Sequence, residues 1–112
     1  MKIEICTYVQ IEKYLYTLKK KFPRRVRVER IGKTIQNRDI LMIVISKNIK
    51  KRRNAVLIDS GIHAREWLAN SSALYFINYL IRNPRLTKVM DFYIIPCLNP
   101  DGYEYTHTQV KI

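Results

Sequence analysis

The stretch that decides the fold of this chain reads Ala55-Val56-Leu57-Ile58-Asp59-Ser60-Gly61, and a mostly apolar segment from Trp67 to Arg82 follows it. Four apolar residues closed by Asp-Ser-Gly predict a short buried strand that ends in a turn. The longer segment stops at Asn83-Pro84 and predicts a helix covered on much of its surface. A strand that leads into a helix is typical of layered α/β domains, so the fold class is predicted to be α/β.

The N-terminal region predicts a further helix. Thr7 is followed three residues later by Gln10, the spacing of a capping box at a helix start. Apolar residues then recur at helical spacing, and the pattern ends at Phe22-Pro23.

Three more strands are predicted, at Val26 to Val28, Ile40 to Ile45 and Phe92 to Leu98. The first two are joined by a polar turn and should pair as a hairpin. Pro96 places the end of the last strand near a sheet edge or a bend, and Asn99-Pro100-Asp101-Gly102 predicts a turn. The predicted order is α-β-β-β-α-β, around a mixed sheet.

Length and composition predict one domain, residues 1–112, with no second domain. Hydrophobic residues form 47% of the chain, which is enough for a packed core. The formal net charge is +12, which attracts nucleic acid, membrane headgroups and acidic substrates alike. No signal peptide is visible, and no apolar run is long enough for a membrane span.

The cysteines, Cys6 and Cys97, are far apart in sequence. Two cysteines form neither a disulfide framework nor a cysteine-based zinc site. We interpret them as two separate thiols, with Cys97 buried in an apolar run.

The residues with the most distinctive chemistry are His63 and Glu66, between the predicted buried strand at 55–58 and the helix that follows it. Open α/β sheets bind ligands at the carboxyl ends of their strands, and imidazole and carboxylate are both ordinary zinc ligands. Side chains three residues apart converge if the turn between them is helical. The alternative is a surface histidine beside a glutamate that stabilises a helix N-terminus. The spacing alone leaves both interpretations open.

The residues around His63 and Glu66 resemble those of a known protein family. Ser60-Gly61-Ile62-His63-Ala64-Arg65-Glu66-Trp67, then a helix, then Asn99-Pro100-Asp101-Gly102-Tyr103, resembles the A/B-type zinc metallocarboxypeptidases. The segment from Tyr8 to Pro23 looks like the first helix of that family, and Ile31 to Thr34 with Asn37 to Ile40 looks like its first hairpin. The resemblance covers nearly the whole chain but only the opening part, less than half, of a typical catalytic domain. It implies the N-terminal portion of a mixed-sheet α/β/α domain.

The resemblance implies one Zn²⁺ ion with His63 and Glu66 as two of its ligands, so the ligand set within the chain is incomplete. Arg65 matches a position along the substrate cleft and is a candidate substrate-binding residue; a solvated arginine is the alternative. The family's third ligand is a histidine further along. His107 lies in a segment that matches another part of the family pattern, in which the histidine is not a zinc ligand. The general base and the arginines that hold the substrate carboxylate lie past residue 112, so no catalytic residue is assigned within the chain.

The implied function is zinc-dependent release of C-terminal amino acids from peptides by a secreted hydrolase, of which this chain is a fragment that is inactive alone. The alternative is a non-catalytic module that binds peptides or polyanions. In this alternative, the basic clusters at Lys19 to Arg27 and Lys50 to Arg53 would bind the polyanion. No Gly-rich phosphate loop or aromatic-interleaved RNA motif accompanies them, which argues against nucleic acid. We interpret these clusters as solvated loops and helix ends.

Overall fold

The strands of this chain form one mixed sheet in the order β1-β2-β4-β3. The computed structural model describes residues 5–108. Its elements are α1 (Tyr8–Lys21), β1 (Val26–Lys33), β2 (Asp39–Ile45), β3 (Ala55–Asp59), α2 (Trp67–Arg82), the 3-10 helix η1 (Leu86–Lys88), β4 (Asp91–Ile95) and α3 (Pro100–Thr108). The predicted α/β class and the order α-β-β-β-α-β are confirmed, with η1 and α3 as additions that the sequence did not predict.

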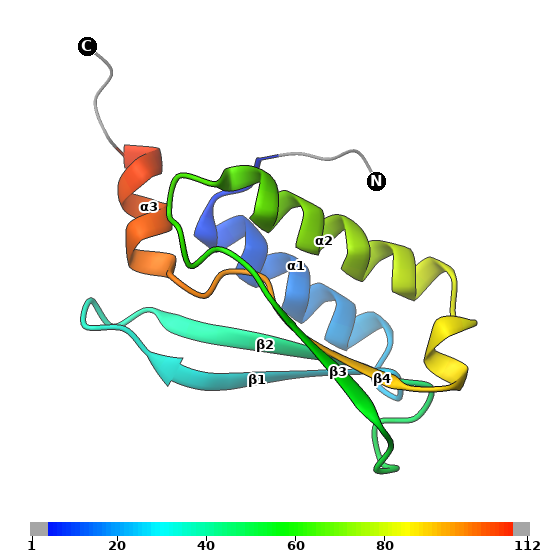
Figure 1. Ribbon diagram of the computed structural model, residues 1–112. Helices are drawn as coiled ribbons and strands as arrows, with labels where there is room; N and C mark the ends of the chain where they lie inside the picture. The colour runs from blue at the N-terminus through cyan, green and yellow to red at the C-terminus, as the bar shows by residue number, and fades with distance from the viewer. Residues whose placement is uncertain (1–4, 109–112) are drawn as a thin grey trace.

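The sheet combines the predicted hairpin with a crossover connection. β1 pairs antiparallel with β2, with an irregularity between Arg30 and Gly32, and β2 pairs antiparallel with β4. β3 pairs parallel with β4, and α2 connects the two. Figure 1 shows α1 and α2 together on one face of the sheet, so the described residues form two layers.

Helix α1 begins where the capping box predicts. The Gln10 N–H donates to the Thr7 hydroxyl over 3.2 Å, and the Thr7 N–H donates to the Gln10 side chain over 2.8 Å. At the other end the Phe22 N–H donates to the Leu18 carbonyl. Both ends of the predicted helix are therefore confirmed.

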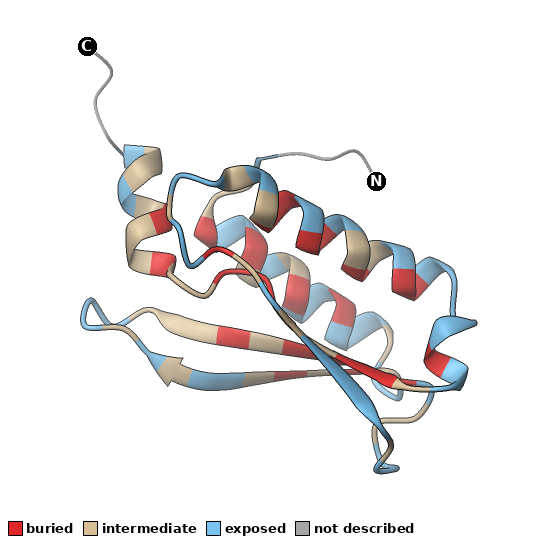
Figure 2. Ribbon diagram, viewed as in Figure 1, coloured by how far each residue is buried: buried red, intermediate tan, exposed pale blue. Residues whose placement is uncertain are grey.

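The core lies between the two helices and the sheet, where Figure 2 shows the buried residues of α1, α2, β2 and β4. Completely buried aliphatic side chains come from all of these elements and include Leu15, Ile43, Ile45, Ile77, Leu80 and Ile94. Each such side chain contributes about 1.5–3 kcal/mol relative to an exposed one. This packing fixes α2 against the sheet and so positions the loop that precedes it.

Strand β3 differs from the prediction of a buried strand. Its residues are mostly exposed, and Leu57 keeps 63% of its surface accessible. The physical reason is its place in the sheet, because within residues 5–108 β3 has β4 as its only strand neighbour. Helix α2 is likewise covered on one face only, with Leu68 and Tyr75 exposed.

The segment after β4 also differs from the prediction. Asn99 to Gly102 was predicted to be a turn, but Pro100 is the first residue of α3. The Asn99 side-chain oxygen accepts a hydrogen bond from the Gly102 N–H over 3.0 Å and so caps the helix. Proline suits the first helical position, since its missing N–H would have no partner there. β4 itself ends before Pro96, which lies in the predicted bend.

No disulfide joins Cys6 and Cys97, and Cys97 is buried, as the interpretation of two separate thiols requires. Burial raises the pKa of the Cys97 thiol to about 12.

Asp101 of α3 connects this helix to the turn between β1 and β2. Its carboxylate accepts hydrogen bonds from the Thr34 hydroxyl at 2.8 Å, from Arg38 Nη1 at 3.0 Å and from the Gln36 N–H at 3.3 Å. Burial opposes ionisation of this carboxyl, but the three hydrogen bonds outweigh it and hold the pKa of Asp101 below its usual range.

Replacing Asp101 by Asn should therefore lower the melting temperature at pH 7 by about 5 °C, as expected from losing hydrogen bonds to a charged group in a domain of this size. Because the pKa is depressed in the folded state, the stabilisation is fully present above the unfolded-state pKa of about 3.9 and is lost as the pH falls through the lower folded value. Thermal unfolding of both forms between pH 7 and pH 2 tests this. The matched control is Asp59→Asn, at an exposed carboxylate of β3. A stability difference that stays constant down to pH 2 would contradict the assignment.

Candidate metal site

The loop between β3 and α2, residues 60–66, carries the two predicted zinc ligands. Two backbone hydrogen bonds fix its first residue, Ser60, to the segment at the end of β4. The Ser60 N–H donates to the Ile95 carbonyl at 3.0 Å, and the Ser60 carbonyl accepts from the Leu98 N–H at 2.8 Å. The Ser60 hydroxyl also donates to the Pro96 carbonyl at 2.8 Å. The loop therefore leaves the carboxyl end of β3 in a defined direction, as the sequence predicts.

Gly61 and Asn70 determine how the loop turns. Gly61 has φ +83, in the left-handed region, and it is buried. A Cβ at this position would collide with the side-chain amide of Asn70. Asn70 is completely buried, and its Nδ2 donates to the Pro96 carbonyl at 2.9 Å. The glycine thus permits the close approach of the loop to α2.

His63 and Glu66 lie at the two ends of one turn, in which the Glu66 N–H donates to the His63 carbonyl at 3.1 Å. Both residues are exposed. Glu66 is the N-cap residue of α2, but its side chain makes no capping hydrogen bond. Within residues 5–108 neither side chain makes a hydrogen bond or an ion pair, so the imidazole and the carboxylate are both available to a ligand.

The part of the chain that the structure describes offers no third metal ligand beside them. Within it, no three His, Cys, Asp or Glu side chains lie close enough to hold one metal ion. His107 lies on α3, with Nδ1 2.9 Å from the Tyr103 carbonyl and its ring stacked on Trp67 at 4.4 Å between centroids. Zinc at a catalytic site takes three protein ligands. The described residues therefore offer at most two of the three ligands that a catalytic zinc site needs.

Arg65 is exposed on the same turn, between the two candidate ligands. No ion pair holds its guanidinium within residues 5–108, and its substrate-binding role stays a prediction.

The sequence did not predict the side-chain contacts that support this loop. The indole N–H of Trp67 donates to the Thr106 hydroxyl at 2.9 Å, and the Asn99 amide donates to the Ile62 carbonyl at 3.3 Å. A Cβ on Gly102 would lie 2.9 Å from the Ala64 Cβ, so α3 packs closely against the loop. Asn70 had a signal in the sequence, since it is an amide side chain at helical spacing from the apolar residues Ala73, Leu74 and Ile77.

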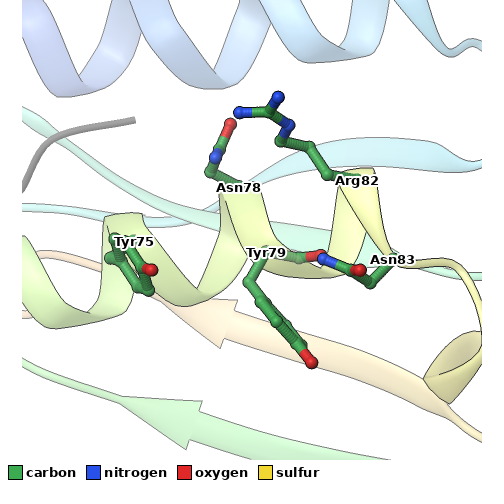
Figure 3. A pocket seen from close by; sticks show the side chains of 5 residues that line it. All are labelled: Tyr75, Asn78, Tyr79, Arg82 and Asn83. Atoms are coloured by element: carbon green, nitrogen blue, oxygen red, sulfur yellow. The ribbon is translucent and has the colours of Figure 1, made fainter.

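Two hollows lie along α2. One, of about 490 Å³, lies beside Ser60 at the start of the loop and is mostly apolar, with Ile58, Ala73 and Phe76 in its lining. The other is shown in Figure 3, where Asn78 and Arg82 extend from one side of α2 while Tyr79 extends from another. These side chains do not converge on one point, which argues against a specific polar ligand there. Among the described helices, none is long and apolar enough to cross a membrane.

Comparison with known proteins finds a matching family model and several relatives of this chain. The family model described as zinc carboxypeptidase matches residues 11–112. Carboxypeptidase B of Astacus astacus is 32% identical over 94% of this chain, and the zinc carboxypeptidase of Simulium vittatum is 36% identical over 91%. The chain spans 36% and 34% of these two relatives, respectively.

Solved structures agree with these matches. The carboxypeptidase A of Helicoverpa armigera superimposes with a TM-score of 0.88 and 32% identity, over 95% of this chain and 27% of that one. Bovine thrombin-activatable fibrinolysis inhibitor, solved in complex with tick carboxypeptidase inhibitor, gives a TM-score of 0.86 and 32% identity, over 96% of this chain and 35% of that one.

Proposed function

This chain belongs to the zinc carboxypeptidase family, and on that premise we propose that it supplies two zinc ligands, His63 and Glu66, to an enzyme that removes C-terminal amino acids from peptides. The observation that carries this proposal is the geometry of their turn. Both residues lie in the loop that follows β3, joined by one turn, and their side chains are exposed and without a hydrogen bond within residues 5–108. We propose that residues 1–112 are part of one peptidase domain, and a secreted location remains a prediction from the family.

The zinc ion would be held by His63, by the Glu66 carboxylate and by a third protein ligand outside residues 5–108. When bound, zinc polarises the carbonyl of the scissile peptide bond. Burial of Asn70 and the left-handed turn at Gly61 keep the two ligands at a fixed place relative to the sheet. Such support limits the entropy that the ligands lose on binding the metal.

Arg65 is proposed to contact the peptide. Its guanidinium is exposed between the two ligands, and its N–H groups suit the carbonyl or carboxylate oxygens of a peptide. The apolar hollow beside Ile58 and Phe76 adjoins the same loop. Its role in the proposed enzyme is not assigned.

A chimera tests this function. Residues 5–108 would replace the matching segment of the carboxypeptidase A of Helicoverpa armigera, on which they superimpose with a TM-score of 0.88. We expect the chimera to bind one zinc ion and to hydrolyse a C-terminal peptide bond. The His63→Ala form should lose zinc and at least about 10³-fold in kcat/KM, because a metal supplies several kcal/mol of transition-state stabilisation.

The matched control is His107→Ala, which removes the other histidine that the structure describes. We expect this form to keep its zinc content, since His107 is held in the aromatic stack on α3. A folded chimera whose zinc content survives His63→Ala would refute the ligand assignment. A folded chimera that binds zinc and has no peptidase activity would refute the proposed reaction.

A further inference from the structure

A basic groove lies at the end of the sheet opposite to the candidate metal site. It has a volume of about 400 Å³ and is lined by Arg24, Lys47, Asn48, Lys51, Arg53 and Lys88. Three segments that are distant in sequence meet there: the turn before β1, the loop after β2 and η1. Figure 1 shows the loop after β2 and η1 at the end of the sheet where β3 and β4 begin. Residues 60–66 leave the sheet at the opposite end, where β3 stops.

Backbone hydrogen bonds hold the wall of the basic groove in place. The Ile49 N–H donates to the Arg24 carbonyl and the Ser46 N–H to the Arg25 carbonyl, each at 2.9 Å. The loop is braced internally by the Asn48 side chain, which accepts from the Lys50 N–H at 3.0 Å. The groove is thus a defined concave surface, and a ligand would not have to order it first.

A second hollow of about 280 Å³ lies beside the basic groove. This hollow shares Lys47 and Lys88 with the first and is completed by Arg25, Pro84 and Thr87. The Arg25 guanidinium donates to the Leu80 and Ile81 carbonyls at the end of α2. The positively charged side chains therefore line both the basic groove and the second hollow, along the end of the sheet.

Positive charge in this region is almost uncompensated. Segments 19–25, 47–54 and 82–91 contain many lysines and arginines but one acidic residue, Asp91. Asp91 is buried, with its Oδ1 3.7 Å from Nε of Arg53, which lines the groove. Arg53 Nη2 is buried without a hydrogen-bond partner. Like charges held together in this way raise the local potential and favour an anionic ligand.

We infer that the basic groove binds the sulfate groups of a narrow linear polyanion, a sulfated polysaccharide. Lysine and arginine donate to sulfate oxygens, and several groups spaced along one chain could contact the groove and the second hollow together. None of the lining residues is aromatic, and single-stranded nucleic acids rely on such residues for base stacking. Reading the sequence of duplex DNA needs a helix or ribbon that enters its major groove, whereas this site is concave and is built from a turn, a loop and the one-turn helix η1. The inference does not depend on zinc or peptidase chemistry, since the site is at the other end of the sheet.

Heparin, as a sulfated probe, tests the inference on the full 112-residue chain. The triple variant Lys47→Gln/Lys51→Gln/Lys88→Gln removes three positive charges from the basic groove. The control Lys13→Gln/Arg30→Gln/Lys33→Gln removes three charges from α1 and β1, which are outside the groove. Isothermal titration from 50 to 200 mM salt should show heparin binding about tenfold weaker for the groove variant, with a salt dependence of log K shallower by about 2. The control should stay within about twofold of the unsubstituted chain.

A third variant, Lys47→Arg/Lys51→Arg/Lys88→Arg, keeps the charges and should keep the affinity, which separates loss of binding from misfolding. Desulfated heparin should not bind. Equal losses in the groove variant and the control would overturn the inference, because net charge alone would then explain binding. Duplex DNA of equal length that binds as tightly as heparin, or no heparin binding at 150 mM salt, would overturn it as well.

Discussion

The Leu80→Ala variant is expected to lose about 2–5 kcal/mol of folding free energy and at least about 10 °C in melting temperature. Leu80 is completely buried between α2 and the sheet. Removing its side chain beyond Cβ forfeits the transfer free energy of the lost carbons and leaves a cavity that the tightly packed neighbours fill only in part. Since domains of this size are stable by about 5–15 kcal/mol, the loss is a large fraction of the total. Denaturant unfolding followed by circular dichroism measures it.

Helix α2 offers a control that changes the same atoms. Leu68 lies in its first turn with 69% of its surface exposed. Leu68→Ala should alter stability by less than about 0.5 kcal/mol, because little apolar surface returns to water. If both variants lost the same free energy, α2 would not pack on the sheet through the face that contains Leu80.

The Gly61→Ala variant is expected to lose about 2–4 kcal/mol. Alanine at φ +83 costs about 1 kcal/mol relative to glycine. Its Cβ would also displace the Asn70 amide from the Pro96 carbonyl. Leaving these buried groups unpaired costs about 1–3 kcal/mol more. The measurement is again denaturant unfolding.

Gly32→Ala is the matched control for Gly61→Ala. At Gly32 a Cβ would meet only the end of the Ile40 side chain, at an ordinary contact distance of 3.9 Å. Its backbone is not in the left-handed region, so we expect a change of less than about 1 kcal/mol. Comparable losses at both positions would show that the Asn70 contact is not what requires glycine at position 61.

The elements that the sequence predicted well are those with local signals. The capping box of Thr7 and Gln10 sets the start of α1, and Phe22-Pro23 sets its end. The predicted bounds of the helix from Trp67 to Arg82 agree with α2, because Asn83-Pro84 cannot continue a helix. The hairpin of β1 and β2 follows from two strand segments joined by a polar turn, although β1 extends to Lys33, past the predicted end at Val28.

The features that the sequence missed depend on distant contacts. An apolar run such as residues 55–58 does not reveal whether its strand is central or at an edge, because that depends on which strands pair with it. The start of α3 had a local signal in Asn99-Pro100, but the same dipeptide is typical of turns. Packing of Gly102 against Ala64 favours the helical outcome.

For the candidate site, the sequence predicted the two donors but not the side-chain contacts that support their loop. Residues His63, Arg65 and Glu66 were found from residue type, spacing and resemblance, all of which are local. Asn70 and Thr106 act through contacts with Pro96 and Trp67, which folding brings near. No spacing rule within one segment predicts such contacts.

Trp67 gives this molecule a built-in optical probe. It is the single tryptophan of the chain, it directly follows Glu66, and its ring stacks on His107. Emission from one indole in one environment has no background from other sites. Metal binding at the neighbouring turn, or separation of α3 from α2, would change the surroundings of this fluorophore. Both events can therefore be followed in the unlabelled protein.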